Sequence, residues 1–283
     1  MRIGKLYYWL FLLPCIAAFI LIILVPAFTG LYYSLTDWNG IGRTANFVGL
    51  SNFTSIFSDG QFWYSFLFSA LFALVSVLLI NTVGFLLALL VTRPFKGRNF
   101  LRSVFFMPNL IGGLLLGFAW QFIFTKVFNA TNIPFLQNWL TNAETGFIGL
   151  MIVMIWQMGG YMMIIYIAAL ENIPQSVNEA AAIDGASGSK RLFRITLPMV
   201  APSFTIGLFL TLSNSFKLFD QNLALTKGGP NSSTQMLALN IYQTAFSFNR
   251  FGEAQAKALI FLVAVAIITG IQLYVSKKGE TEL

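Results

Sequence analysis

The stretch GQFWYSFLFSALFALVSVLLINTVGFLLALLVT, residues 60–92, runs for 33 residues without a charged side chain. An α-helix rises 1.5 Å per residue, so about 20 apolar residues cross the hydrocarbon core of a bilayer. The apolar residues are continuous and do not alternate with polar ones, as they do in the strands of a membrane barrel. Because backbone groups in a bilayer must hydrogen-bond within their own segment, this stretch predicts a transmembrane helix.

Five further apolar runs of the same kind lie on either side, at residues 6–36, 103–125, 145–170, 195–216 and 258–276. The composition agrees, because 10% of the residues are charged, against about 25% in soluble domains. We therefore predict an all-α membrane protein in which residues 1–283 form a single transmembrane domain. The expected helices span about residues 8–30, 66–91, 103–124, 146–170, 200–220 and 257–276.

The positive charges are distributed unevenly among the connections between these helices. Eleven of the 17 Lys and Arg residues lie before the first helix, in the second and fourth connections, or after the last helix: Arg2, Lys5, Arg93, Lys96, Arg98, Arg102, Lys190, Arg191, Arg194, Lys277 and Lys278. Cytoplasmic loops of membrane proteins carry the excess of cations, which predicts that both termini are cytoplasmic. The net charge of +7 therefore indicates membrane topology and not a nucleic-acid partner, and we expect a multi-pass protein of the bacterial inner membrane.

The first apolar run has a second interpretation, because Arg2 and Lys5 precede it as cations precede the core of a signal peptide. The run is longer than the 7–15 apolar residues of such a core, which favours a retained helix. The only cysteine, Cys15, lies within it. A single cysteine excludes an intramolecular disulfide and favours a packing role.

Residue types that carry chemistry are scarce in this chain. It has no histidine, one cysteine and no carboxylate cluster in its predicted helices, which argues against common metal sites and acid–base catalysis. The segment GASGSK, residues 185–190, lacks the spacing of a Walker A motif. We therefore expect no catalytic residues, no metal ligands and no cofactor in this chain, so ATP-driven transport would require a separate subunit.

The connection between the fourth and fifth helices, residues 171–199, reads ENIPQSVNEAAAIDGASGSKRLFRITLPM. Ser176 and Glu179 have the spacing of a capping box, which predicts the start of a short helix. Gly185 suits the left-handed position that ends a helix. This segment can be a simple loop helix or a docking helix, whose small side chains and carboxylate enter a groove on another protein.

A second short helix is predicted through residues 190–196. We expect Pro198 to end it, because proline cannot continue the backbone hydrogen-bonding pattern of a helix interior.

The octapeptide EAAAIDGA, residues 179–186, followed by Phe193, Ile195, Leu197 and Pro198, resembles the EAA loop of bacterial ABC importer permeases. Three other segments resemble the carbohydrate-uptake branch of these permeases: FVGLSNFTSIF from Phe47, FKGRNFLRSVFFMP from Phe95 and FKLFDQNLALTKGGPNSSTQ from Phe216. The TKGGP stretch within the last segment is similar to MalF-type subunits and distinguishes them from their MalG-type partners.

This resemblance implies the bundle of a type I ABC importer permease. It implies that Glu179, Ala180, Ala181, Asp184 and Gly185 couple the bundle to an ATPase. The implied partners are a MalG-type permease, ABC ATPase subunits that bind ATP and Mg²⁺, and an extracytoplasmic sugar-binding protein, in addition to membrane lipid. The implied function is translocation of a sugar or oligosaccharide into the cytoplasm by ATP-driven alternating access.

Polar residues inside the membrane helices are candidates for the substrate path, because they are costly there unless they face the bundle or water. Amides can bind sugar hydroxyls and an aromatic ring can stack on a sugar face, which points to Gln157, Gly159, Tyr161, Asn214 and Ser215. The adjacent glycines 159 and 160 either loosen the fourth helix or form a small-residue packing interface.

Other intramembrane polar groups have simpler interpretations. Asn81 and Gln272 are expected to bond neighbouring helices. Lys217 and Asp220, three residues apart, are expected to form a local ion pair.

Alternative functions are an ion-coupled secondary transporter, an ABC permease for a non-sugar polar solute, and a membrane enzyme. A secondary transporter should show intramembrane carboxylates or an inverted repeat, and neither is evident. The missing histidines and scarce acids argue against an enzyme.

Overall fold

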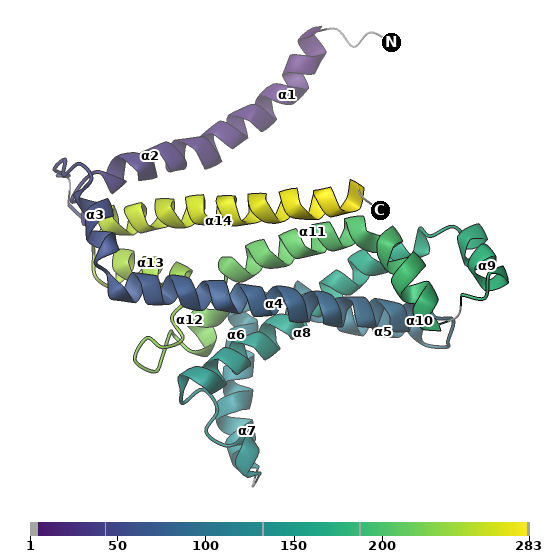
Figure 1. Cartoon of the computed structure of the whole chain (residues 1–283). Coiled ribbons are helices and arrows are strands. Elements are labelled where there is room, and N and C mark those ends of the chain that lie inside the picture. Colours follow the sequence, from purple (N-terminus) through teal and green to yellow (C-terminus); the bar gives the residue numbers. More distant parts are fainter. Residues whose placement is uncertain (1–4, 43, 132, 187, 282–283) are drawn as a thin grey trace. The chain divides into compact units, whose positions relative to one another are not determined.

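The computed structural model describes residues 5–42, 44–131, 133–186 and 188–281, and almost all regular structure in these ranges is helical (Figure 1). The extended pairing found there is a single bridge between Thr36 and Phe47. Six helices in the described part are long and apolar enough to cross a membrane: Tyr8–Ser34, Gly60–Thr92, Gly113–Ala130, Ala143–Glu171, Gly188–Phe216 and Phe251–Gly279. The predicted all-α membrane fold is confirmed, and the orientation of the termini stays a prediction.

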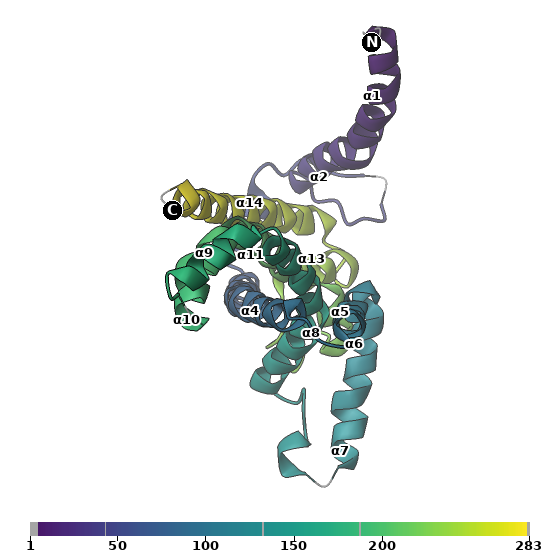
Figure 2. The ribbon, with the colours of Figure 1, turned by 90° about the vertical axis from the view of Figure 1, so that its right-hand side faces the viewer.

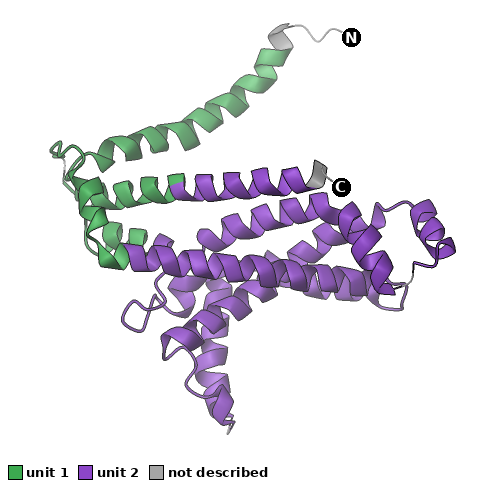
Figure 3. Cartoon of the chain, viewed as in Figure 1, with its two compact units in different colours: residues 1–62, 240–263 green, residues 63–239, 264–283 purple. Residues whose placement is uncertain are grey.

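The chain divides into two compact units (Figure 3). Unit 1 comprises residues 1–62 and 240–263, and unit 2 comprises residues 63–239 and 264–283. The helices of unit 1 are α1 (Lys5–Phe19), α2 (Val25–Ser34), α3 (Ser51–Phe57), most of α13 (Leu237–Phe246) and the first part of α14 (Phe251–Thr281).

Within unit 1, the loop after α2 packs closely on the start of α14. The amide of Gly252 donates a hydrogen bond to the carbonyl oxygen of Trp38 at 2.9 Å, and the indole of Trp38 stacks on Tyr33 with ring centroids 4.2 Å apart. A Cβ atom at position 252 would collide with the backbone carbonyl of Thr36. Glycine is therefore required here by the close approach of two backbone segments.

Unit 2 contains the remaining helices and the main apolar core. Its helices are α4 (Gly60–Thr92), α5 (Arg98–Phe106), α6 (Gly113–Phe122), α7 (Phe128–Ala130), α8 (Ala143–Glu171), α9 (Gln175–Ile183), α10 (Gly188–Arg191), α11 (Leu197–Phe216) and α12 (Asp220–Leu225). Among the candidate spans α8 is the most buried, and it packs against α5, α11 and α12. Figure 2 shows α8 among α4, α5, α6 and α11.

The paired glycines of α8 do not break it, because the helix is continuous from Ala143 to Glu171. A Cβ atom at Gly160 would overlap the backbone carbonyl of Phe105 on α5. On α4, a Cβ at Gly84 would lie 2.6 Å from the Cβ of Met162. The small-residue packing interface is therefore the correct interpretation of this pair, since small residues let helix backbones approach closely in membranes.

The helix expected at about residues 103–124 is interrupted in the structure. Helix α5 ends at Phe106, a 3₁₀ turn covers Met107–Leu110, and α6 begins only at Gly113. Ile111 between them is extended. Pro108 lacks the amide hydrogen that would continue the helix, and the interruption divides this segment into a charged helix of 9 residues and an apolar helix of 10 residues.

The prediction that Pro198 ends a helix is wrong. Helix α10, a π-helical turn at Leu192–Thr196 and α11 form one span from Gly188 to Phe216. Pro198 lies in the first turn of α11, immediately after the π-helical turn. A wider π turn already displaces the regular hydrogen-bonding pattern, so the missing amide of proline costs little at this position.

Candidate functional site

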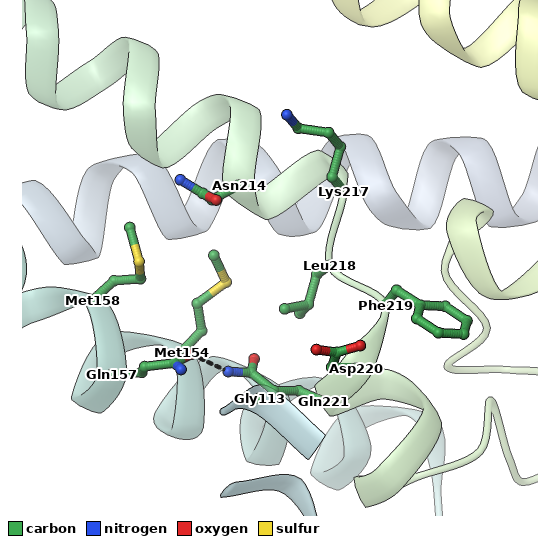
Figure 4. Close-up of a pocket in the computed structure, with 10 residues that line it drawn as sticks. All are labelled: Gly113, Met154, Gln157, Met158, Asn214, Lys217, Leu218, Phe219, Asp220 and Gln221. Atoms are coloured by element: carbon green, nitrogen blue, oxygen red, sulfur yellow. Dashed lines mark hydrogen bonds between the residues drawn. The ribbon is translucent and has the colours of Figure 1, made fainter. Parts of the chain in front are cut away.

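A cavity of about 260 Å³ lies among α6, α8, the end of α11 and α12, all within unit 2 (Figure 4). Three lining residues come from α8, and the others come from α6, α11, α12 and the link between α11 and α12. The lining consists of Gly113, Met154, Gln157, Met158, Asn214, Lys217, Leu218, Phe219, Asp220 and Gln221.

Two glutamines form one wall of this cavity. The side-chain amide of Gln221 donates a hydrogen bond to Oε1 of Gln157, and Gln157 Nε2 donates to the carbonyl oxygen of Ile111 at 3.0 Å. Gln221 is 1% exposed, and its Oε1 has no hydrogen-bond partner within the described part of the chain. Buried polar atoms are normally hydrogen-bonded, so this carbonyl oxygen is an acceptor that the described residues leave unsatisfied.

The cavity wall also carries one cation and one anion. The predicted ion pair of Lys217 and Asp220 is wrong, because no contact within 4.0 Å joins their charged atoms in the described structure. Helix α11 ends at Phe216 and α12 starts at Asp220, so the two residues do not share a helical turn. The wall therefore combines amides, one positive and one negative side chain, and apolar side chains such as Met154 and Phe219. Its net charge is zero.

The residues predicted for the substrate path divide into two groups. Gln157 and Asn214 line the cavity, from α8 and α11. Ser215 is buried, with its hydroxyl 3.8 Å from the sulfur of Met154. Gly159 packs on Val83 of α4, and neither it nor Tyr161 is among the residues that line the cavity.

Gln221 was missed by the sequence analysis, although it lies in the quoted segment that starts at Phe216. The hydropathy pattern places Gln221 outside the apolar runs, and nothing in it indicates that α12 folds back against α6. That contact is close, because a Cβ atom at Gly117 of α6 would lie 2.5 Å from the Cβ of Ala224.

The expected roles of Asn81 and Gln272 are confirmed. Asn81 Nδ2 donates to the Thr211 hydroxyl at 2.9 Å, and the Tyr166 hydroxyl donates to Asn81 Oδ1 at 2.5 Å. Gln272 Nε2 lies 3.5 Å from the carbonyl oxygen of Thr205. Both side chains join separate helices.

Helix α9 contains the EAA-type residues, but its start differs from the prediction. The capping box is wrong: Pro174 precedes the first turn, and no side chain caps the helix. Glu179 Oε1 instead accepts a hydrogen bond from Nε2 of Gln175 at 2.7 Å, one helical turn earlier. Proline at this boundary fixes a backbone angle suited to starting a helix.

The end of α9 follows the prediction. Gly185 has φ +69°, its amide donates to Ala182, and the amide of Ala186 donates to the carbonyl oxygen of Ala181 at 2.9 Å. These two bonds form a Schellman motif, which ends the helix with its last carbonyl groups satisfied.

The side chains of α9 have distinct environments. Glu179, Ala180, Asp184 and Gly185 are exposed, whereas Ala181 is 4% exposed. Figure 1 shows α9 at one end of unit 2. At this end, Arg102 of α5 forms an ion pair with Glu171 at the end of α8, with 2.8 Å between the charged atoms.

Comparison with known proteins identifies the family. The sequence profile of the family described as "Binding-protein-dependent transport system inner membrane component" matches residues 80–279. The chain belongs to this family. It is therefore a multi-pass permease component of the inner membrane, and the resemblance to ABC importer permeases is confirmed.

Relatives of the permease match it from end to end. It is 51% identical over 284 residues to the probable starch degradation products transport system permease protein AmyD of Thermoanaerobacterium thermosulfurigenes, covering 99% of this chain and 97% of that protein. It is 33% identical over 287 residues to the multiple sugar-binding transport system permease protein MsmF of Streptococcus mutans, covering 98% of each.

The fold of the permease is also found in solved structures. A chain of a bacterial ABC transporter involved in import of the acidic polysaccharide alginate matches with a TM-score of 0.82 and 21% identity, over 97% of this chain and 96% of that chain. The arrangement of helices is thus that of an ABC importer permease.

Proposed function

We propose that this permease is the MalF-type subunit of an ABC importer that carries a sugar or oligosaccharide into the cytoplasm. The observation that carries the proposal is the 51% identity, over nearly the whole chain, to a permease named for starch degradation products. Oligosaccharides released from starch are therefore the first substrates to test.

The cavity beside Gln157 suits such a substrate. Gln157, Gln221 and Asn214 supply amides for sugar hydroxyls, and Phe219 and the methionines supply an apolar surface for a ring face. Nδ2 of Asn214 donates to the carbonyl oxygen of Leu210 at 2.8 Å. Its Oδ1 is therefore the atom that would accept a hydrogen bond from a sugar hydroxyl.

Other solutes are less well matched. Lys217 could attract an anion, but Asp220 faces the same cavity with the opposite charge, which favours a neutral solute. An ion-coupled transporter needs carboxylates deep in its spans. In the described spans Glu144, Glu171 and Glu253 all lie within three residues of a span end.

The proposed partners are a MalG-type permease, ABC ATPase subunits and an extracytoplasmic sugar-binding protein. ATP and Mg²⁺ would bind to the ATPase subunits, since the chain has no Walker A motif. We place both termini and α9 on the cytoplasmic side, because 11 of the 17 Lys and Arg residues lie in the terminal segments, in the connection from α4 through α5 and in the connection from α9 to α11.

Helix α9 would transmit ATPase closure to the bundle. Its exposed Glu179, Ala180, Asp184 and Gly185 form a thin surface that can enter a groove, whereas Ala181 is buried. Closing the ATPases would draw two such helices together and open the bundle outward to the binding protein.

The coupling role is tested by Glu179→Lys. We expect the protein to fold and reach the membrane normally, while ATP-driven uptake is abolished and the ATPase no longer co-purifies. Glu144→Lys, the same charge reversal at an exposed site at the other end of α8, should leave both unchanged. Normal uptake by the Glu179 variant would refute the coupling role.

The substrate class is tested separately, in proteoliposomes that contain the complete transporter and its binding protein. Starch-derived oligosaccharides should stimulate ATP hydrolysis and accumulate in the lumen, whereas a sugar phosphate should do neither. If only the sugar phosphate is transported, the neutral-sugar assignment is wrong, although the permease function would stand.

A further inference from the structure

A second hollow of unit 2 lies on the surface formed by α4 and the segment from the π-helical turn at Leu192–Thr196 through α11. It has a volume of about 450 Å³ and is separate from the cavity around Gln157. It is lined by Val77, Leu78, Asn81, Thr82, Phe85, Leu86, Leu89, Leu192, Phe193, Leu197, Phe204 and Leu208, and we refer to it as the α4–α11 groove.

The α4–α11 groove presents an apolar surface although two of its residues are polar. Asn81 makes hydrogen bonds to Val77, Thr211 and Tyr166, which use its amide groups within the protein. The Thr82 hydroxyl donates to the carbonyl oxygen of Leu78 at 2.7 Å. A polar ligand would therefore find few partners here, whereas a hydrocarbon chain would not strand any polar group.

The length of the groove matches one leaflet of a bilayer. Its residues on α4 run from Val77 to Leu89, which corresponds to about 18 Å along the helix axis. The hydrocarbon core is about 30 Å thick, so one leaflet accounts for about half of that depth. A single acyl chain parallel to α4 would fill the groove.

One end of the groove has a basic rim. Arg93 follows Leu89 by four residues and directly follows the end of α4, and Lys190 precedes Phe193 by three residues on α10. Both cations therefore lie within four residues of side chains that line this end of the groove. Figures 1 and 2 both show α10 beside the end of α4. Both cations are exposed, and neither forms an ion pair among the described residues.

We infer that the α4–α11 groove binds an anionic phospholipid, with one acyl chain along α4 and α11 and the phosphate against Arg93 and Lys190. In the proposed orientation this is the cytoplasmic leaflet, where anionic lipids are concentrated and basic pockets between helices bind their headgroups. All residues that line the groove belong to this chain. The inference therefore does not depend on which substrate is transported.

Native mass spectrometry of the full-length chain, purified with its co-purifying subunits, tests the headgroup contact. The probes are phosphatidylglycerol and phosphatidylcholine with identical acyl chains. The parent should retain phosphatidylglycerol in preference to phosphatidylcholine. In the double variant Arg93→Gln/Lys190→Gln we expect the affinity for phosphatidylglycerol to fall about fivefold for each cation removed. Lys126→Gln/Lys227→Gln, with the same loss of charge at exposed sites elsewhere in unit 2, should behave as the parent. Equal retention by the two double variants would overturn the inference.

The acyl-chain contact needs its own variant. Leu86, 58% exposed in the groove, is changed to Trp to fill it, and Leu74→Trp, at a 69% exposed position of α4 that does not line the groove, is the control. Phosphatidylglycerol retention should be lost only in Leu86→Trp. If a cysteine at position 86, in a Cys15→Ser background, instead forms a disulfide with a second permease, then a protein helix covers the groove and the lipid assignment is wrong.

Discussion

The ammonium nitrogen of Lys257 lies 2.8 Å from Oδ2 of Asp59, and the side chain of Lys257 is 3% exposed. The same nitrogen lies 3.1 Å from both Oε1 of Glu253 and the hydroxyl of Thr244. The Asp59 carboxylate also accepts the amide of Phe62, at the start of α4. One buried cation therefore fastens α13, α14 and the start of α4 within unit 1.

Removing this cation should destabilise unit 1 strongly. Lys257→Met leaves Asp59 without its cation and leaves Glu253 paired with Arg250 alone. Breaking a buried ion pair from one side costs about 3 to 5 kcal/mol. We expect the unfolding temperature in detergent to fall by about 6 °C or more. Lys126→Met, at an exposed site, is the control and should change it little. An unchanged unfolding temperature for Lys257→Met would show that the cluster contributes nothing.

The same cluster predicts a dependence on acidity. Burial raises the pKa of the Asp59 carboxyl, but the hydrogen bond and charge of Lys257 and the Phe62 amide lower it more, so the net pKa is below its ordinary value. A carboxyl of this kind binds protons more readily when unfolded, so its stabilisation is complete above about pH 4 and is lost as the pH falls through the lower folded value.

The measurement is unfolding temperature against pH for the parent and Asp59→Asn. The two proteins should differ most at pH 7, and the difference should shrink toward pH 3. Asp184→Asn, which changes an exposed carboxyl of the α9 segment, should match the parent at both pH values. A constant difference across this range would contradict the role of the Asp59 charge.

The close contact of α8 with α5 predicts that Gly160→Ala is damaging. The added methyl would overlap the backbone carbonyl of Phe105, and backbone cannot move aside as a flexible side chain can. We expect a reduced yield of folded protein in size-exclusion chromatography. Gly270→Ala on α14 meets no atom within 4 Å and should stabilise the helix by up to about 1 kcal/mol. Similar yields for both variants would argue against tight packing at Gly160.

The sequence predicts the membrane class, the number of spans and the helix end at Gly185 well, because hydropathy and the preference of glycine for the left-handed conformation are local properties. Two features are harder to predict from the sequence: the break near Pro108 and the helix that continues through Pro198. A proline ends a helix or begins one according to the turn before it. Gln221 could not be found from hydropathy, because its place in the cavity depends on the packing of α12 on α6, a contact between residues about a hundred positions apart.

The glutamine pair of the cavity allows the last prediction, which concerns transport. Gln157 and Gln221 are hydrogen-bonded to each other, and Gln221 Oε1 has no partner in the described part of the chain. If both amides contact the passing solute, Gln157→Leu and Gln221→Leu should each reduce uptake at saturating binding protein about five- to tenfold. The loss of uptake in the double variant should be smaller than the product of the two single losses, because the residues share one hydrogen bond.

Gln121→Leu is the control for this prediction. Gln121 Nε2 donates a hydrogen bond to the carbonyl oxygen of Leu225 at 3.2 Å, and Gln121 does not line the cavity. Equal losses for all three single variants would indicate a packing effect, and full activity of Gln221→Leu would remove this residue from the substrate path.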